Sequence, residues 1–123
     1  MIIVDSSILV AAFRKDEIHH QTALRTCQSA DQILVIDYVL AETLTVLKMR
    51  ESIYIMQKCH DFLFDSEGII FDRLSDEEVK MSTDFFYSHQ KNLSFVDCAL
   101  VIYKKCRNLP LATFDKYLQK VLS

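Results

Sequence analysis

The sequence is poor in the residues that build tight turns, with one glycine and one proline among 123 residues. A β-sandwich or barrel needs many tight turns, so this composition argues against an all-β fold. Half of the residues are hydrophobic and a quarter are charged, which is the balance of a soluble globular protein and excludes a disordered chain. The length suits one domain, and no linker or repeat divides it, so we predict a single domain over residues 1–123.

The sequence also lacks an excess of positive charge, because its formal net charge is −3. A protein that holds nucleic acid through its phosphates is usually basic. Either the partner is not a nucleic acid, or something other than lysine and arginine meets the phosphates locally. A divalent cation bound by the protein would do this.

Long apolar runs and cysteine motifs are missing as well. No apolar stretch approaches the ~20 residues of a membrane helix. The apolar run at the N-terminus is interrupted by Asp5, so we expect no signal peptide. The cysteines form no C-x-x-C pair and match no zinc ribbon or finger; they are Cys27, Cys59, Cys98 and Cys106. We predict a cytoplasmic protein without a membrane segment, whose cysteines are reduced and buried.

Short apolar runs alternate with helical patterns along the chain. Runs suited to buried strands occur at residues 2–4, 33–36, 69–71 and 111–113. Helical patterns occupy residues 8–13, 19–29, 38–49, 53–64, 75–89, 94–107 and 116–122. Strands that are joined by helices of this length pair in parallel. We therefore predict an α/β fold with three layers, α/β/α, around a mostly parallel sheet of about four to five short strands.

Acidic residues border the predicted strands. Asp5 directly follows the first strand, and Asp115 comes two residues after Thr113 at the end of the fourth. Glu42 lies in the first turns of the helix that follows the second strand. Asp97 lies in the first turn of the helix before the fourth strand, and periodicity alone does not place the start of that helix. Ligands bind beyond the carboxyl ends of parallel strands, so this edge is the candidate site.

Each acid also has a purely structural interpretation. Asp5 and Asp115 stand where helix N-caps would, and Asp97 completes a capping box with Ser94. Glu42 lies at the border of an apolar helix face, where an unpaired carboxylate costs stability. One cluster would explain all of them together, because Mg²⁺ and Mn²⁺ prefer oxygen ligands and relieve the repulsion between carboxylates. Such a cation would offer a site for a phosphodiester.

The segments that contain these acids resemble the motifs of PIN domains. In chain order the segments are Met1–Leu9, Leu40–Leu44, Leu93–Leu100 and Ala112–Lys116. Their order and spacing match over nearly the whole chain, and the length is similar to that of the single-domain VapC-type toxins of this family. The sequence departs in two details: Ser6 stands where threonine is commoner, and Asp37 is an additional acid before the second motif.

The resemblance implies a PIN-like fold and a metal-dependent endoribonuclease, the toxin of a type II toxin–antitoxin pair. It implies RNA as the substrate, Mg²⁺ or Mn²⁺ as the cofactor, a cognate antitoxin as a partner and a homodimer as the assembly. It also implies that Ser7 and Thr113 are supporting polar groups near the metal. The catalytic and metal-binding residues that it implies are Asp5, Glu42, Asp97 and Asp115.

Two other classes of function stay open at this point. The first is a PIN-like domain that binds RNA or a protein without cleaving it. The second is a phosphatase of the haloacid-dehalogenase type, but that fold requires Asp-x-Asp after its first strand and here Ser7 follows two residues after Asp5. Arg14 and Lys15 are open to two interpretations, a solvated surface or a rim that contacts RNA.

Overall fold

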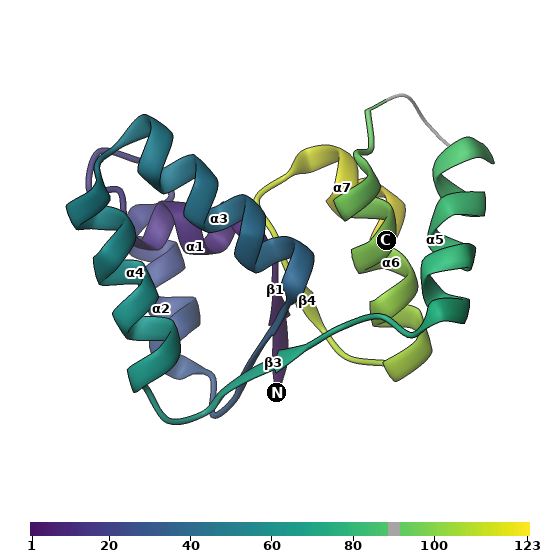
Figure 1. Cartoon of the computed structure of the whole chain (residues 1–123), viewed down its shortest axis with the longest axis horizontal. Coiled ribbons are helices and arrows are strands. Elements are labelled where there is room, and N and C mark those ends of the chain that lie inside the picture. Colours follow the sequence, from purple (N-terminus) through teal and green to yellow (C-terminus); the bar gives the residue numbers. More distant parts are fainter. Residues whose placement is uncertain (89–91) are drawn as a thin grey trace.

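The computed structural model describes residues 1–88 and 92–123, in which four strands alternate with seven helices (Figure 1). The strands are β1 (Ile2–Val4), β2 (Ile33–Ile36), β3 (Ile69–Asp72) and β4 (Leu111–Ala112). The helices are α1 (Ser6–Ala12), α2 (His20–Ser29), α3 (Asp37–Arg50), α4 (Ile53–Asp65), α5 (Asp76–Ser88), α6 (Phe95–Arg107) and α7 (Lys116–Leu122). All predicted elements are present, with ends that differ by one or two residues; the predicted end of the α5 helix, His89, lies outside the described residues.

The strands form one parallel sheet in the order β3-β2-β1-β4. Ile3 of β1 is in register with Leu34 of β2 on one side and with Leu111 of β4 on the other. The predicted parallel α/β fold is therefore confirmed. Because β1 lies between β2 and β4, Asp5 at its end lies between the segments that follow its two neighbours.

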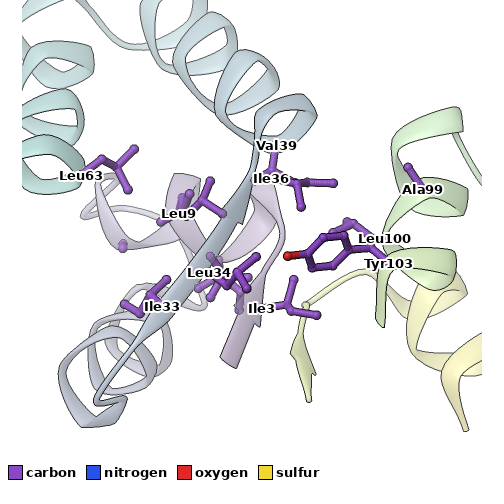
Figure 2. Packing of buried hydrophobic residues seen from close by; sticks show 14 of the residues in the cluster. Ile3, Leu9, Ile33, Leu34, Ile36, Val39, Leu63, Ala99, Leu100 and Tyr103 are labelled. Atoms are coloured by element: carbon purple, nitrogen blue, oxygen red, sulfur yellow. The ribbon is translucent and has the colours of Figure 1, made fainter. Parts of the chain in front are cut away.

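Helices cover both faces of the sheet, as a three-layer arrangement requires. Figure 1 shows α1 to α4 on one side of the strands and α5 to α7 on the other. Figure 2 shows Leu100 and Tyr103 of α6 pointing toward Ile3 and Ile36 of the sheet. All residues of β2 are buried, which explains its continuous apolar run. In the part of the chain that the structure describes, no helix has the length and apolar character needed to cross a membrane.

The single glycine of the chain is required at the turn before β3. Gly68 has a φ of 80°, in the left-handed region that other residues avoid. A Cβ atom at this position would lie 2.6 Å from the carbonyl oxygen of Asp31. The carbonyl of Gly68 accepts the N–H of Ile33 at 2.8 Å, so this close approach aligns β3 with β2.

The cysteines are all free thiols, but they are not all buried. Cys59 and Cys98 are buried and Cys27 is partly buried, whereas Cys106 is exposed. The prediction of a buried thiol is therefore wrong for Cys106. The buried face of α6 ends at Tyr103, and Cys106 falls in the solvated last turn of the helix.

A polar network fastens the end of α6 to β3 and α5. The guanidinium of Arg107 donates to both carboxylate oxygens of Glu78. It lies 3.7 Å from the ring centroid of Tyr103, whose hydroxyl donates to Asp72 at 2.6 Å. Because Glu78 is buried, this charge depends on Arg107 for compensation. The network fixes the helix whose first turn carries Asp97.

Candidate active site

Asp5 is the most enclosed acid at the carboxyl edge of the sheet, with 5% of its surface exposed. It is the N-cap of α1, and its Oδ1 accepts the N–H of Ile8 at 3.3 Å and the hydroxyl of Ser7 at 2.6 Å. The hydroxyl of Thr113 donates to Oδ2. The carboxylate is thus held from its own turn and from the segment that follows β4.

The same hydroxyl groups join the loops that follow β1 and β4. Ser7 Oγ accepts the N–H of Phe114 at 2.9 Å, and Thr113 Oγ1 accepts the N–H of Asp115 at 3.0 Å. Each hydroxyl group therefore accepts a hydrogen bond from a backbone N–H of the segment after β4 and donates a hydrogen bond to Asp5. Ser7 and Thr113, which the family resemblance implied as supporting groups, are both direct partners of Asp5.

Glu42 reaches the edge from the start of α3 and is partly buried, as its place on the helix predicted. The hydroxyl of Ser6 donates to its Oε1. The sequence pattern predicted no role for Ser6. Two signals could have found it: a partly buried glutamate needs a donor, and Ser6 is the hydroxyl residue adjacent to Asp5 in the first motif.

Asp97 and Asp115 both cap helices, so the structural interpretation of each is confirmed. Asp97 Oδ2 accepts the N–H of Ser94 at 3.0 Å, and Ser94 Oγ accepts the N–H of Asp97 at 3.1 Å, which completes the capping box of α6. Asp115 Oδ1 accepts the N–H groups of Tyr117 and Leu118 at 2.9 and 3.0 Å. Each cap uses one carboxylate oxygen and leaves the other oxygen of that residue outside the cap.

The negative charges of the candidate acids raise the pKa values of their neighbours. Burial raises the pKa of Asp97 above its ordinary value, the hydrogen bonds with Ser94 lower it, and the charges of Asp115 and Glu42 raise it further. Burial also raises the pKa of Asp5, against the hydrogen bonds that lower it, and the charge of Asp97 adds to the rise. Figure 1 shows α6 beginning in the upper part of the view, where the chain also passes from β4 into α7.

The donor set fits a hard cation in chemistry, although it is not arranged as a finished cage. Carboxylate and hydroxyl oxygens are the ligands that Mg²⁺ and Mn²⁺ prefer. A positive charge here would favour the ionised forms of Asp5 and Asp97, the two acids whose pKa burial and neighbouring charges raise. Among residues 1–88 and 92–123, however, no three acidic, histidine or cysteine side chains already converge as metal ligands.

The basic pair that follows α1 is divided between two environments. Arg14 forms an ion pair with Glu51, at the C-terminal end of α3. Lys15 is exposed to solvent. The structure thus gives Arg14 a partner within the fold and leaves Lys15 as the solvated member of the pair.

The chain has a parallel α/β sheet with Asp5 and Asp115 in the segments that follow β1 and β4. It is a member of the PIN domain family, whose model matches residues 2–122. A comparison with curated protein sequences found no match.

Two solved structures share this fold. One is the sarcin–ricin loop cleaving toxin VapC20 of Mycobacterium tuberculosis, which is 20% identical with a TM-score of 0.88, over 98% of this chain and 95% of that chain. The other is a toxin–antitoxin complex from Klebsiella pneumoniae, which is 16% identical with a TM-score of 0.69, over 94% of this chain and 87% of that chain. The three-layer PIN fold thus extends over nearly the whole chain.

Proposed function

We propose that this protein is a metal-dependent endoribonuclease that hydrolyses phosphodiester bonds of RNA. The observation that carries the proposal is the buried carboxylate of Asp5, held by Ser7 and Thr113 beside the charge of Asp97. A buried acid that lies close to another acid is unfavourable for folding unless it serves a ligand. Membership of the PIN family supports the same activity.

Some residues of the site would hold a cation, and others orient the carboxylates that hold it. Asp5, Glu42, Asp97 and Asp115 would supply oxygen ligands for Mg²⁺ or Mn²⁺ and act as the catalytic acids. When bound, the cation stabilises charge on the phosphate and lowers the pKa of a water molecule. Hydrogen bonds fix the direction of two of these carboxylates, from Ser7 and Thr113 to Asp5 and from Ser6 to Glu42.

A bound cation also answers the question posed by the net charge of −3. An acidic edge without a cation repels a phosphodiester. Mg²⁺ or Mn²⁺ would reduce the negative charge of this edge and present a positive ion to the substrate phosphate, so no excess of basic residues is needed. The affinity of such a protein for RNA should therefore depend strongly on the divalent cation.

The structural neighbours suggest a biological setting. The Mycobacterium tuberculosis protein is described as a toxin that cleaves the sarcin–ricin loop, and the Klebsiella pneumoniae structure is a toxin–antitoxin complex. We propose that this chain is likewise the toxin of a type II pair, acts in the cytoplasm and is neutralised by a cognate antitoxin protein. A small reading frame beside its gene that encodes a DNA-binding motif would support this setting.

The direct test is cleavage of a labelled mixture of structured RNAs in buffers that differ only in the divalent cation. We expect cleavage in millimolar Mg²⁺ or Mn²⁺ and a loss of more than about 100-fold in excess EDTA, since the cation supplies both the charge and the activated water. Addition of Mg²⁺ beyond the EDTA should restore the rate. Full activity in excess EDTA would contradict the proposal.

A non-cleaving module that binds RNA or protein is the alternative, and one observation favours it. Asp97 and Asp115 already serve as helix caps, and no finished metal cage is found within the described residues. A binding module would retain RNA on a filter in Mg²⁺ without producing shorter fragments. The same RNA mixture therefore separates the two functions.

The assembly that we propose is a homodimer. Large apolar side chains are exposed along α4 and the neighbouring edge strand β3, with exposed fractions of 61% for Ile53, 51% for Phe64 and 39% for Phe71. The rings of Phe64 and Phe71 stack with their centroids 4.8 Å apart, so α4 and β3 share an exposed apolar contact, and exposed apolar surface of this kind is typical of an interface. Light scattering at micromolar concentration is expected to give twice the mass of the chain, and Phe64→Glu should shift it toward the monomer. Tyr87→Glu, on α5, is the matched control; a monomeric wild type would contradict the prediction.

A further inference from the structure

An imidazole ring lies flat against an aromatic ring beside the acidic edge. The rings of His19 and Phe114 stack with their centroids 4.3 Å apart and their planes 13° apart. Phe114 stands between Thr113, which donates to Asp5, and Asp115, and its own N–H donates to Ser7. The stacked pair is therefore connected to Asp5 through the backbone of Phe114 and the hydroxyl group of Ser7.

The position of His19 is unusual for a ring that only fills space. It precedes α2 at the N-cap position, yet its side chain makes no capping hydrogen bond. The residue is exposed to solvent although its ring stacks on Phe114. A packing role would favour an apolar ring with both faces covered. Here Phe114 covers one face of the His19 ring, and the residue as a whole remains exposed to solvent.

We propose that His19, supported by Phe114, stacks an unpaired nucleobase of the RNA next to the phosphate at the acidic edge; this inference rests on the proposed function. Proteins that recognise single-stranded RNA stack unpaired bases on aromatic and histidine rings, and the contact tolerates different bases because each base has a π-face. Since the backbone of Phe114 is hydrogen-bonded to Ser7, a partner of Asp5, the stacked base and the scissile phosphate would be held at a fixed separation.

The charge of the protein makes such a contact useful. With a net charge of −3, the chain does not supply the general attraction to phosphates that basic RNA-binding proteins use. Stacking gives affinity without positive charge. It also selects an unpaired nucleotide at one position, because a base within a double helix already stacks on its neighbours.

The test combines changes in the protein with a change in the RNA. A single-stranded RNA oligomer of mixed sequence is first mapped for its cleavage site in Mg²⁺, and a series is then made with one abasic nucleotide at each flanking position. We expect His19→Ala to lower kcat/KM about tenfold, the size of one lost stacking contact, and His19→Phe to stay near the wild type. Ile18→Ala, at the adjacent position whose side chain is 87% exposed, is the control for disturbance of the loop.

One abasic position should lower kcat/KM of the wild type about tenfold and have no further effect on His19→Ala, because both changes remove the same contact. Additive effects at every abasic position, or a His19→Ala variant as active as the wild type, would overturn the inference while cleavage itself stands. Absence of cleavage by the wild type would instead refute the proposed function and the inference with it. If His19→Ala melts early, His19→Phe and the abasic series with wild-type protein still decide.

Discussion

Replacement of Asp5 by asparagine is expected to reduce RNA cleavage by more than about 100-fold. Even the loss of a group that only orients a metal ligand costs about 10- to 100-fold, and Asp5 is proposed as a ligand itself. Asparagine has the same shape and retains an oxygen that can accept from Ser7 and Ile8, so the turn should survive. The measurement is the initial rate of cleavage at saturating Mg²⁺.

The same substitution is expected to raise the melting temperature of the metal-free protein at neutral pH. Burial and the charge of Asp97 raise the pKa of Asp5 above its unfolded value, so ionisation of this group opposes folding. The stability of the wild type in EDTA should therefore fall, relative to the variant, as the pH rises from about 4 through the raised pKa. Thermal melts of the wild type and Asp5→Asn between pH 4 and pH 8 in EDTA measure this difference in stability.

Millimolar Mg²⁺ should reverse the order, because a ligand that binds the native state stabilises it and only the wild type retains the complete donor set. Asp97→Asn should behave in the same way, since an asparagine oxygen can keep the capping bond from the N–H of Ser94. Asp65→Asn, an exposed substitution at the end of α4, is the matched control and should change neither the rate nor the response to Mg²⁺. Lower melting temperatures for both Asp5→Asn and Asp97→Asn in EDTA, with equal responses to Mg²⁺, would show that these acids do not form a metal-binding cluster.

Glu78→Gln is expected to lower the free energy of unfolding by about 3 kcal/mol at pH 7, because it removes one partner of a buried ion pair. The hydrogen bonds from Arg107 hold the pKa of Glu78 at about 2, against an ordinary value of 4.5, and this difference corresponds to about 3 kcal/mol. Asp72, at 3.6 Å, then remains as a charged partner of the Arg107 guanidinium. Urea unfolding followed by circular dichroism measures the loss.

The pH dependence of this effect has a defined sign. A carboxylate whose folded pKa is depressed stabilises the protein above its unfolded pKa and ceases to do so as the pH falls through the folded value. The difference between the wild type and Glu78→Gln should therefore be constant near neutrality and shrink from about pH 4.5 toward pH 2. Glu77→Gln, at the exposed neighbouring position, is the control and should unfold like the wild type. Equal stability of Glu78→Gln and the wild type at pH 7 would show that the network of Arg107 is not a net support of the fold.

The order of helices and strands was largely predictable because short-range sequence patterns determine it. The continuous β-branched run at Ile33–Ile36 predicted a strand with both faces covered, and all its residues are buried. The capping box at Ser94 predicted the start of α6, and this box forms. Ser75 and Glu78 form a second capping box at the start of α5. Intervals that suit crossover helices predicted parallel pairing. These signals act within a few residues, so no knowledge of distant contacts was needed.

The candidate site was predictable only as a set of residues. The ends of β1 and β4 placed Asp5 and Asp115 at one edge, but the position of Asp97 depends on how α6 docks. That docking is decided by side chains from β3, α5 and α6 itself, through Asp72, Glu78 and Arg107. Such partners are about 30 residues apart, and no periodicity relates them.

The sequence by itself determined that this chain folds as one parallel α/β domain and carries its acids in the order of a PIN domain. Only the tertiary structure decided the strand order β3-β2-β1-β4, the donation from Ser6 to Glu42 and the stack of His19 on Phe114. The physical reason is the distance along the chain over which each interaction acts. Local backbone preferences and apolar periods select helices and strands, whereas a hydrogen bond or a stacked ring between distant segments exists only after packing has brought them together.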